Sequence, residues 1–75
     1  MMPLFLIKSG EVVKIVSVGG GRGAKYRLSQ MGLSIGDIVQ VVQNTGGPVI
    51  IKKGNIRIAI GAGLSGKIFV IPYKK

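Results

Sequence analysis

The stretch from Arg27 to Val41 constrains the fold of this chain more than any other part of its sequence. Leu28 and Met31 lie three residues apart, as two side chains on one face of a helix do. Gly32 can adopt the left-handed conformation that ends a helix. Gly36-Asp37 favours a turn, and the alternating apolar run that follows indicates a strand. The stretch therefore predicts a helix, a glycine stop, a tight turn and a strand.

Short runs rich in β-branched residues, which favour strands, occur on both sides of this stretch. Turn residues separate the runs at short, even spacing, which indicates a barrel or a sandwich. The expected strands are Leu4–Ile7, Glu11–Val18, Ile38–Gln43, Pro48–Lys52, Ile56–Ile60 and Lys67–Pro72, and the expected helix is Arg22–Met31. For residues 1–75 we predict one mostly β domain. It would be a small SH3-like barrel of about five or six strands with one short α-helix inserted after the second strand, since closure removes exposed edges.

The predicted helix has an apolar stripe of Ala24, Leu28 and Met31, at the spacing of a face that packs on a core. Tyr26 falls on the opposite side, and Arg22, Lys25, Ser29 and Gln30 fall on the flanks. In the later strand, alternation predicts that Ile56, Ile58 and Ile60 face the core. The segment Gly61–Gly66 is expected to be a turn, at most with one turn of 3₁₀ helix.

Charge narrows the choice of partners. The chain carries 11 Lys and Arg against 2 Asp and Glu, a net charge of +9. Such a balance favours nucleic acid, an anionic membrane surface or an acidic protein face, although a solvated surface that aids solubility would look the same. No run approaches the roughly 18 apolar residues that span a bilayer. The apolar start, Met1–Ile7, lacks a basic leader and a cleavage site, so we expect a soluble, intracellular protein without membrane insertion.

The residues that usually carry catalysis or bind metals are scarce. There is no His or Cys, and the side-chain carboxylates are Glu11 and Asp37. Each directly follows a turn glycine, where an acid is expected to accept hydrogen bonds from nearby backbone. A catalytic pair of the two acids or a Lys-assisted serine stays open, but we expect no enzyme, no cofactor and no metal site.

Two anion-binding alternatives remain. The run Gly19–Gly23 precedes the helix and could cradle a phosphate, although a turn that needs positive φ angles is favoured. Small basic barrels also bind RNA and single strands through stacking aromatics. Phe5 and Phe69 are expected in the core, so only sequence-independent electrostatic binding is supported, and no specific nucleic acid is expected. The alternative function is a basic nucleic-acid-binding module, such as an RNA- or ribosome-associated one.

The pattern as a whole resembles the FeoA family. The resemblance begins at Gly10 and Ile15, is strongest over Arg27–Gly36, and continues through Val39, Val41, Gly47–Val49, Ile56–Ile60 and Ile68–Val70. It implies an SH3-like barrel with a helical insertion, similar also to the C-terminal domain of DtxR-type repressors. It implies, too, a small cytoplasmic accessory protein of bacterial ferrous iron uptake. The implied partner is FeoB, a membrane transporter with a GTP-binding domain, whose GTP hydrolysis or gating the contact could alter.

For this contact the expected partner-binding residues are Arg22, Lys25 and Tyr26 on the outer helix face and Leu33 in the turn after it. An ordinary half-exposed tyrosine is the alternative for Tyr26, and a core position is the alternative for Leu33. The apolar N-terminal strand could pair between chains, so a homo-oligomer stays open. Neither the sign of the effect on the transporter nor the oligomeric state follows from the sequence.

Overall fold

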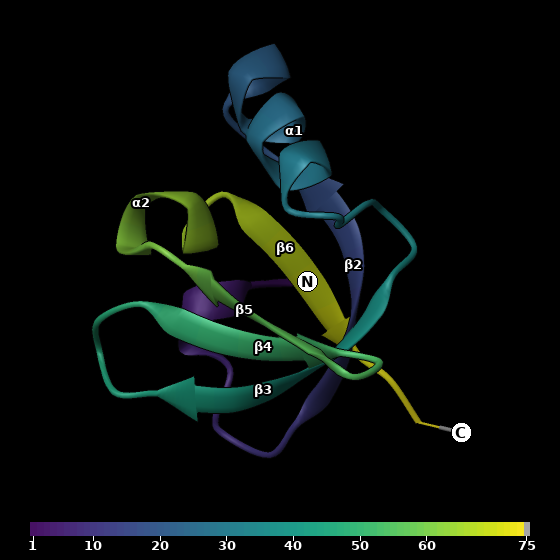
Figure 1. Ribbon diagram of the computed structural model, residues 1–75, viewed down its shortest axis with the longest axis vertical. Helices are drawn as coiled ribbons and strands as arrows, with labels where there is room; N and C mark the ends of the chain where they lie inside the picture. The colour runs from purple at the N-terminus through teal and green to yellow at the C-terminus, as the bar shows by residue number, and fades with distance from the viewer. Residues whose placement is uncertain (75) are drawn as a thin grey trace.

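The computed structural model of the protein describes residues 1–74 as one curved antiparallel sheet with helices at its margins (Figure 1). Its strands lie in the order β1-β6-β2-β3-β4-β5. The elements are β1 (Met2–Pro3), a 3₁₀ helix η1 (Leu4–Leu6), β2 (Val12–Val18), α1 (Gly21–Gln30), β3 (Ile38–Asn44), β4 (Val49–Lys53), β5 (Ile56–Ile60), α2 (Ala62–Ser65) and β6 (Ile68–Pro72). This agrees with the predicted small barrel and its helix inserted after the second strand, β2.

Two irregularities curl the sheet around its core. The pairing of β2 with β6 shifts between Ile15 and Ser17, and the pairing of β3 with β4 shifts between Val41 and Gln43. Such bulges bend a strand and increase its twist. The sheet curls around a core of aliphatic side chains but is not closed, because β1 and β5 remain its two edges. The buried hydrophobic residues are Leu4, Ile7, Val13, Ile15, Val18, Ala24, Leu28, Leu33, Val39, Val41, Val49, Ile51, Ile60, Leu64, Ile68 and Val70.

The N-terminal strand prediction over Leu4–Ile7 is wrong. Leu4–Leu6 is a 3₁₀ helix, and the Ile7 amide donates to the Leu4 carbonyl at 3.0 Å. Leu4 and Ile7 are both buried. Residues three apart share a face of a 3₁₀ helix, whereas a strand would turn them to opposite faces. As a consequence Phe5 is 42% exposed, so its predicted core position is also wrong.

The prediction for the alternating strand β5 holds at one end and fails at the other. Ile60 is fully buried and Ile58 is partly buried against the core. Ile56 is 66% exposed, contrary to the prediction. It pairs with Lys53 next to the hairpin turn, and so projects past the end of the core although it lies on the inward side of the strand.

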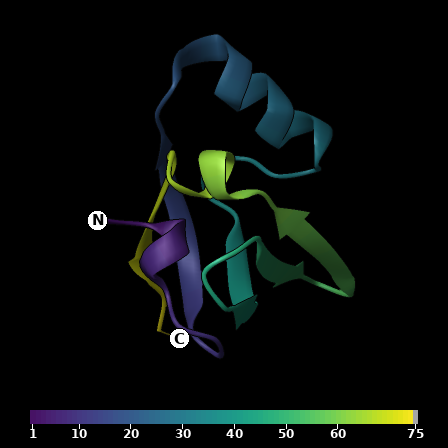
Figure 2. The same ribbon diagram turned by 90° about the vertical axis from the view of Figure 1, so that its left-hand side faces the viewer.

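The segment before β6 is more ordered than the sequence suggested. Ala62–Ser65 forms a short α-helix rather than a turn, and it buries Leu64 and Ser65. The Ser65 hydroxyl donates to the Ala62 carbonyl at 3.1 Å, which satisfies the buried polar group. Figure 2 shows α2 beneath α1, at the end of the barrel that α1 crosses.

Candidate docking site

The helix α1 is attached to the barrel through two glycines and a narrow apolar stripe. Gly20 and Gly21 precede and open the helix with φ angles of 84° and 73°, which confirms the interpretation of this run as a turn that needs positive φ. A Cβ on Gly20 would lie 2.8 Å from Cδ of Lys67. Ala24 and Leu28 are buried, and Met31 packs partly buried beside them, as the stripe predicted.

The C-terminal end of α1 is closed by a Schellman motif, as the sequence indicated. Gly32 has a φ of 81°. Its amide donates to the Ser29 carbonyl at 3.0 Å, and the Leu33 amide donates to the Leu28 carbonyl at 3.1 Å. Leu28 and Leu33 are both buried, which is the apolar contact that accompanies this motif. The motif fixes the direction in which the chain leaves the helix.

A tight turn then returns the chain to the sheet. The Asp37 amide donates to the Ser34 carbonyl at 3.1 Å. In return the Ser34 amide donates to Oδ2 of Asp37 at 2.9 Å. Gly36, with a φ of 101°, supplies the positive angle that the turn needs. Its amide bonds the carbonyl of Ile15 at 2.7 Å, which fastens the turn to β2.

Lys53, from the hairpin between β4 and β5, holds this segment from the other side. Its ammonium donates to the Gly32 carbonyl and to Oδ2 of Asp37, both at 2.8 Å. The hydrogen bond from Lys53 lowers the pKa of Asp37 below its ordinary value of 3.8. The ammonium also lies close to the negative end of the α1 dipole, where a cation is favourable. No local motif in the sequence indicates this role of Lys53.

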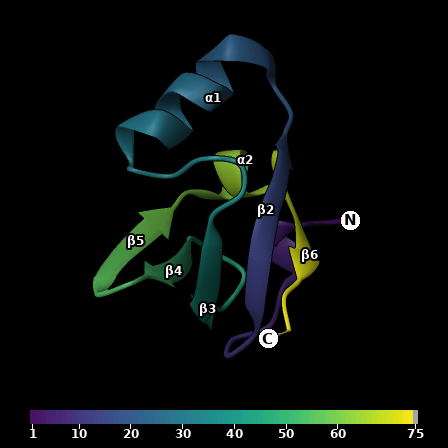
Figure 3. The same ribbon diagram turned by 90° about the vertical axis from the view of Figure 1, so that its right-hand side faces the viewer.

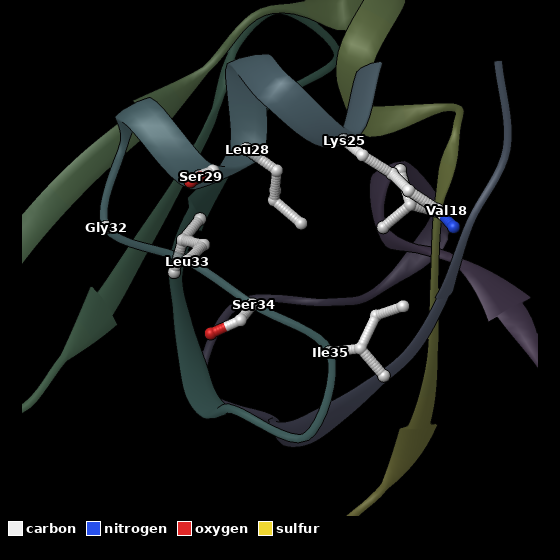
Figure 4. A pocket seen from close by; sticks show the side chains of 8 residues that line it. All are labelled: Val18, Lys25, Leu28, Ser29, Gly32, Leu33, Ser34 and Ile35. Carbon is white, nitrogen blue, oxygen red and sulfur yellow. The ribbon is translucent and has the colours of Figure 1, made fainter. Parts of the chain in front are cut away.

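An open pocket of about 560 Å³ lies between α1, the end of β2 and the segment that follows the helix (Figure 4). Leu28 projects into it from α1, and Ile35 projects into it from the loop (Figure 4). Ile35 is 53% exposed, so the pocket presents apolar surface to a partner. The lining residues are Val18, Lys25, Leu28, Ser29, Gly32, Leu33, Ser34 and Ile35.

The structure brings two of the four proposed partner-binding residues to this pocket. Lys25 and Leu33 line it, with Lys25 exposed at its rim and Leu33 only 2% exposed in its wall. Leu33 is therefore a core residue, the alternative that the sequence left open. Tyr26 is 65% exposed and accepts a hydrogen bond from Nε2 of Gln30 at 3.1 Å. Arg22 is also exposed, but neither it nor Tyr26 lines the pocket.

Ile35 and Lys53 are the residues of this region that the sequence analysis did not propose. Ile35 carries a readable signal, because a large aliphatic residue between Ser34 and Gly36 stands at the tip of an expected turn. Lys53 carries no such signal, because its hydrogen-bond partners Asp37 and Gly32 lie 16 and 21 residues away along the chain.

The two carboxylates have the local roles that their positions predicted. Oε2 of Glu11 accepts from the Lys8 amide at 3.2 Å, as Oδ2 of Asp37 does from Ser34. Within residues 1–74 no three or more His, Cys, Asp and Glu side chains come together as metal ligands would. None of the helices in the described part of the chain has the length and apolar character to cross a membrane. The features that stand out at α1 are thus an open pocket lined by both apolar and polar residues, and exposed cations.

Comparison with known proteins relates this sequence and fold to one family. A model of the FeoA domain matches residues 2–72. A putative Fe(2+) transport protein A of Methanocaldococcus jannaschii is 46% identical over 70 residues, which cover 93% of this chain and 85% of the relative. A crystal structure of an iron uptake regulatory protein (FeoA) is 38% identical with a TM-score of 0.86, over 96% of both chains.

A more distant likeness concerns the fold alone. The manganese regulator SloR matches 96% of this chain with a TM-score of 0.86, at 16% identity and over 34% of its own length. The fold is therefore the SH3-like one that the resemblance to FeoA and to DtxR-type repressors implied. The family match over nearly the whole chain, together with the closely related relative, shows that this protein belongs to the FeoA family.

Proposed function

We propose that this protein takes part in ferrous iron transport as a non-enzymatic accessory protein. It would act in the cytoplasm by docking on the cytosolic part of a FeoB-like membrane transporter with a GTP-binding domain, and it would modulate GTP hydrolysis or gating there. Membership of the FeoA family and the name of the Methanocaldococcus jannaschii relative support the link to Fe(2+) transport. The partner, the effect on the partner and the contact surface are parts of the proposal.

The observation that carries the docking proposal is the open pocket, lined by both apolar and polar residues, beside the exposed face of α1. Its floor of Leu28 and Leu33 is fixed by the Schellman motif, so the pocket has a defined shape before any partner arrives. Lys25 at the rim and nearby Arg22 add positive charge. Apolar side chains at the centre of a surface, with polar residues around them, are the usual anatomy of a protein-binding site.

A binding assay with the cytosolic domain of the transporter from the same organism tests this. Arg22→Glu with Lys25→Glu should weaken binding at least about tenfold, because two attractive charges become repulsive. Tyr26→Ala should weaken binding by a similar factor, because exposed tyrosines are frequent hot spots of protein interfaces. The charge reversal should act partly on the association rate and lose its effect as salt rises. Thermal unfolding of each variant should match the parent, since the substituted residues are exposed.

The matched control reverses two exposed charges away from α1, with Lys8→Glu and Lys74→Glu, and should leave binding unchanged. Equal losses in control and test variants would mean that only net charge matters. Absence of binding by the parent chain would contradict the docking proposal. Tight binding to single-stranded or duplex nucleic acid, with no contact to the transporter, would favour the alternative of a basic nucleic-acid-binding module.

A further inference from the structure

The outer face of the sheet carries a row of side chains that runs across four strands. Val12 lies opposite Gln40, Gln40 opposite Lys52, and Lys52 opposite Arg57. Directly opposite residues in an antiparallel pair share a face of the sheet. Residues directly before or after them along the strands, such as Val13, Val39 and Ile51, are buried. The row of Val12 to Arg57 therefore points outward.

A second row lies beside the first and is mainly apolar. Lys14 pairs with Ile38 on β3 and with Ile71 on β6, so one cation stands between two isoleucines. Val12, Ile38 and Ile71 are 38%, 41% and 39% exposed. Neighbouring strands lie about 4.8 Å apart, which makes these aliphatic side chains parts of one patch. We call the surface formed by Val12, Lys14, Ile38, Lys52, Arg57 and Ile71 the basic sheet face.

The cations of this face have no acidic partner among residues 1–74. Both side-chain carboxylates of the described residues are engaged elsewhere. Asp37 forms an ion pair with Lys53, and Glu11 accepts a hydrogen bond from the backbone amide of Lys8. Lys52 and Arg57 stand directly opposite one another. Like charges in that position destabilise a sheet. An arrangement that costs stability in the free protein is relieved when an anionic partner lies over both cations.

We propose that the basic sheet face binds an acidic amphipathic segment of a partner protein. Carboxylates of the segment would pair with Lys14, Lys52 and Arg57, and its apolar side chains would cover Val12, Ile38 and Ile71. Charge complementarity selects the acidic partner, because the face carries cations only. The exposed aliphatic side chains select a protein over a nucleic acid, since bases stack on aromatic rings and Tyr73 at the border is half-buried.

The basic sheet face is distinct from the α1 site. In Figure 3 α1 lies beyond the end of β2. The basic sheet face is formed by residues within the strands, on the side away from the buried core. Lys14, Lys52 and Arg57 are not among the residues that line the pocket at α1. The proposal therefore stands independently of docking through α1, and the two can be tested with separate substitutions.

The test measures binding of the whole chain to a labelled peptide of about 16 residues with Leu and Glu at helical spacing, by fluorescence anisotropy. A second peptide keeps every Glu and replaces each Leu by Ser. The parent protein should bind the Leu peptide, and should bind the Ser peptide at least about tenfold more weakly, because the aliphatic contacts are lost.

Substitutions in the protein locate the site. Lys52→Gln with Arg57→Gln, and separately Ile38→Ser, should each weaken binding of the Leu peptide about tenfold or more. The matched control, Lys8→Gln with Lys67→Gln, removes the same charge from two exposed positions outside both surfaces and should leave peptide binding within about twofold. Thermal unfolding of every variant checks that the fold is kept, and Lys52→Gln alone provides a milder charge variant.

Three results would overturn the proposal. The first is that the parent chain does not bind the Leu peptide. The second is that the control variant loses as much affinity as the Lys52 and Arg57 variant, which would mean that net charge alone attracts the peptide. The third is tighter binding of a single-stranded oligonucleotide or of phosphatidylserine vesicles through the same residues. Loss of transporter binding in α1 variants, by contrast, bears only on the proposed function.

Discussion

At the scale of single residues, Lys53 has the largest structural role that no motif indicates. One ammonium group joins the end of α1, through the Gly32 carbonyl, to the turn that contains Asp37. It thereby links the β4–β5 hairpin to the segment that forms the wall of the pocket. Its side chain is 40% exposed, so solvent screening keeps the energy of the ion pair modest.

Replacing Lys53 by Met should lower the free energy of unfolding by about 1 kcal/mol, because an exposed ion pair and one hydrogen bond are lost. The pH dependence has a definite sign. The pKa of Asp37 is lowered in the folded protein from 3.8, so the pair stabilises the fold above that pH and its contribution disappears as the pH falls below it. Urea unfolding at pH 7 and pH 3 should therefore show a smaller difference between parent and Lys53→Met at pH 3. An equal difference at both values would contradict this.

Gly32 tests the end of the helix. Gly32→Ala should destabilise the protein by about 1 kcal/mol, because alanine resists the left-handed conformation. No atom lies within 4 Å of the added Cβ, so the cost is conformational and not a clash. Gly63→Ala is the control, since Gly63 lies in α2 without a positive φ and alanine favours a helix there. Thermal melts that rank the two variants in the opposite order would contradict the Schellman assignment.

At the scale of elements, α1 rests on the barrel through few side chains, of which Leu28 is the most buried at 2% exposure. Leu28→Ala should cost about 2–4 kcal/mol in the free energy of unfolding. Tyr26→Ala on the opposite side should stay within about 0.5 kcal/mol, the range of surface substitutions. Chemical denaturation of both variants measures the contrast. Equal values would mean that the packed face of the helix has been misassigned.

The pair of Lys52 and Arg57 gives a prediction for the sheet. Arg57→Glu should raise the free energy of unfolding by about 0.2–1 kcal/mol, because a like-charge pair directly across two strands becomes an opposite-charge pair. The same substitution should abolish binding of the acidic peptide, so stability and binding change in opposite directions. Lys8→Glu, which lies outside the strands, serves as the control. A destabilised Arg57→Glu protein would show that the two cations do not repel one another in the folded state.

The elements differ in how far the sequence could predict them. The end of α1 and the turn at Asp37 were readable, because glycine and aspartate fix local backbone geometry wherever they occur. The 3₁₀ helix within Leu4–Ile7 could not be predicted, because four consecutive apolar residues have no period that separates a strand from a 3₁₀ helix. The predicted burial of Ile56 was wrong because alternation shows which side of the strand a residue faces, but not where the core ends.

In the candidate site, too, the sequence predicts local features but not those that depend on tertiary packing. Lys25 and Tyr26 could be placed on the outer side of α1 from helical spacing alone. The pocket could not be predicted, because it depends on how far α1 stands from the sheet. The rows of the basic sheet face were also hidden, since strand register sets them and the cations lie far apart in the sequence.

At the scale of the whole molecule, the net charge of +9 is divided over surfaces with different neighbours. Cations at α1 border a pocket of mixed apolar and polar lining. Those of the basic sheet face lie among exposed aliphatic side chains. Under the two proposals the protein would bind two acidic surfaces at once, one at the end of the barrel and one on its side. This is why substitutions at α1 and on the sheet should have separable effects on binding.

The central claim, that the protein docks on its transporter through α1, has one direct test. The ¹⁵N-labelled chain is titrated with the cytosolic domain of the FeoB-like transporter, and amide shifts are followed by NMR. We expect the largest changes within residues 21–35, over α1 and the pocket wall. Changes confined to β4, β5 and β6, or no change at saturating concentrations of the transporter domain, would contradict the claim.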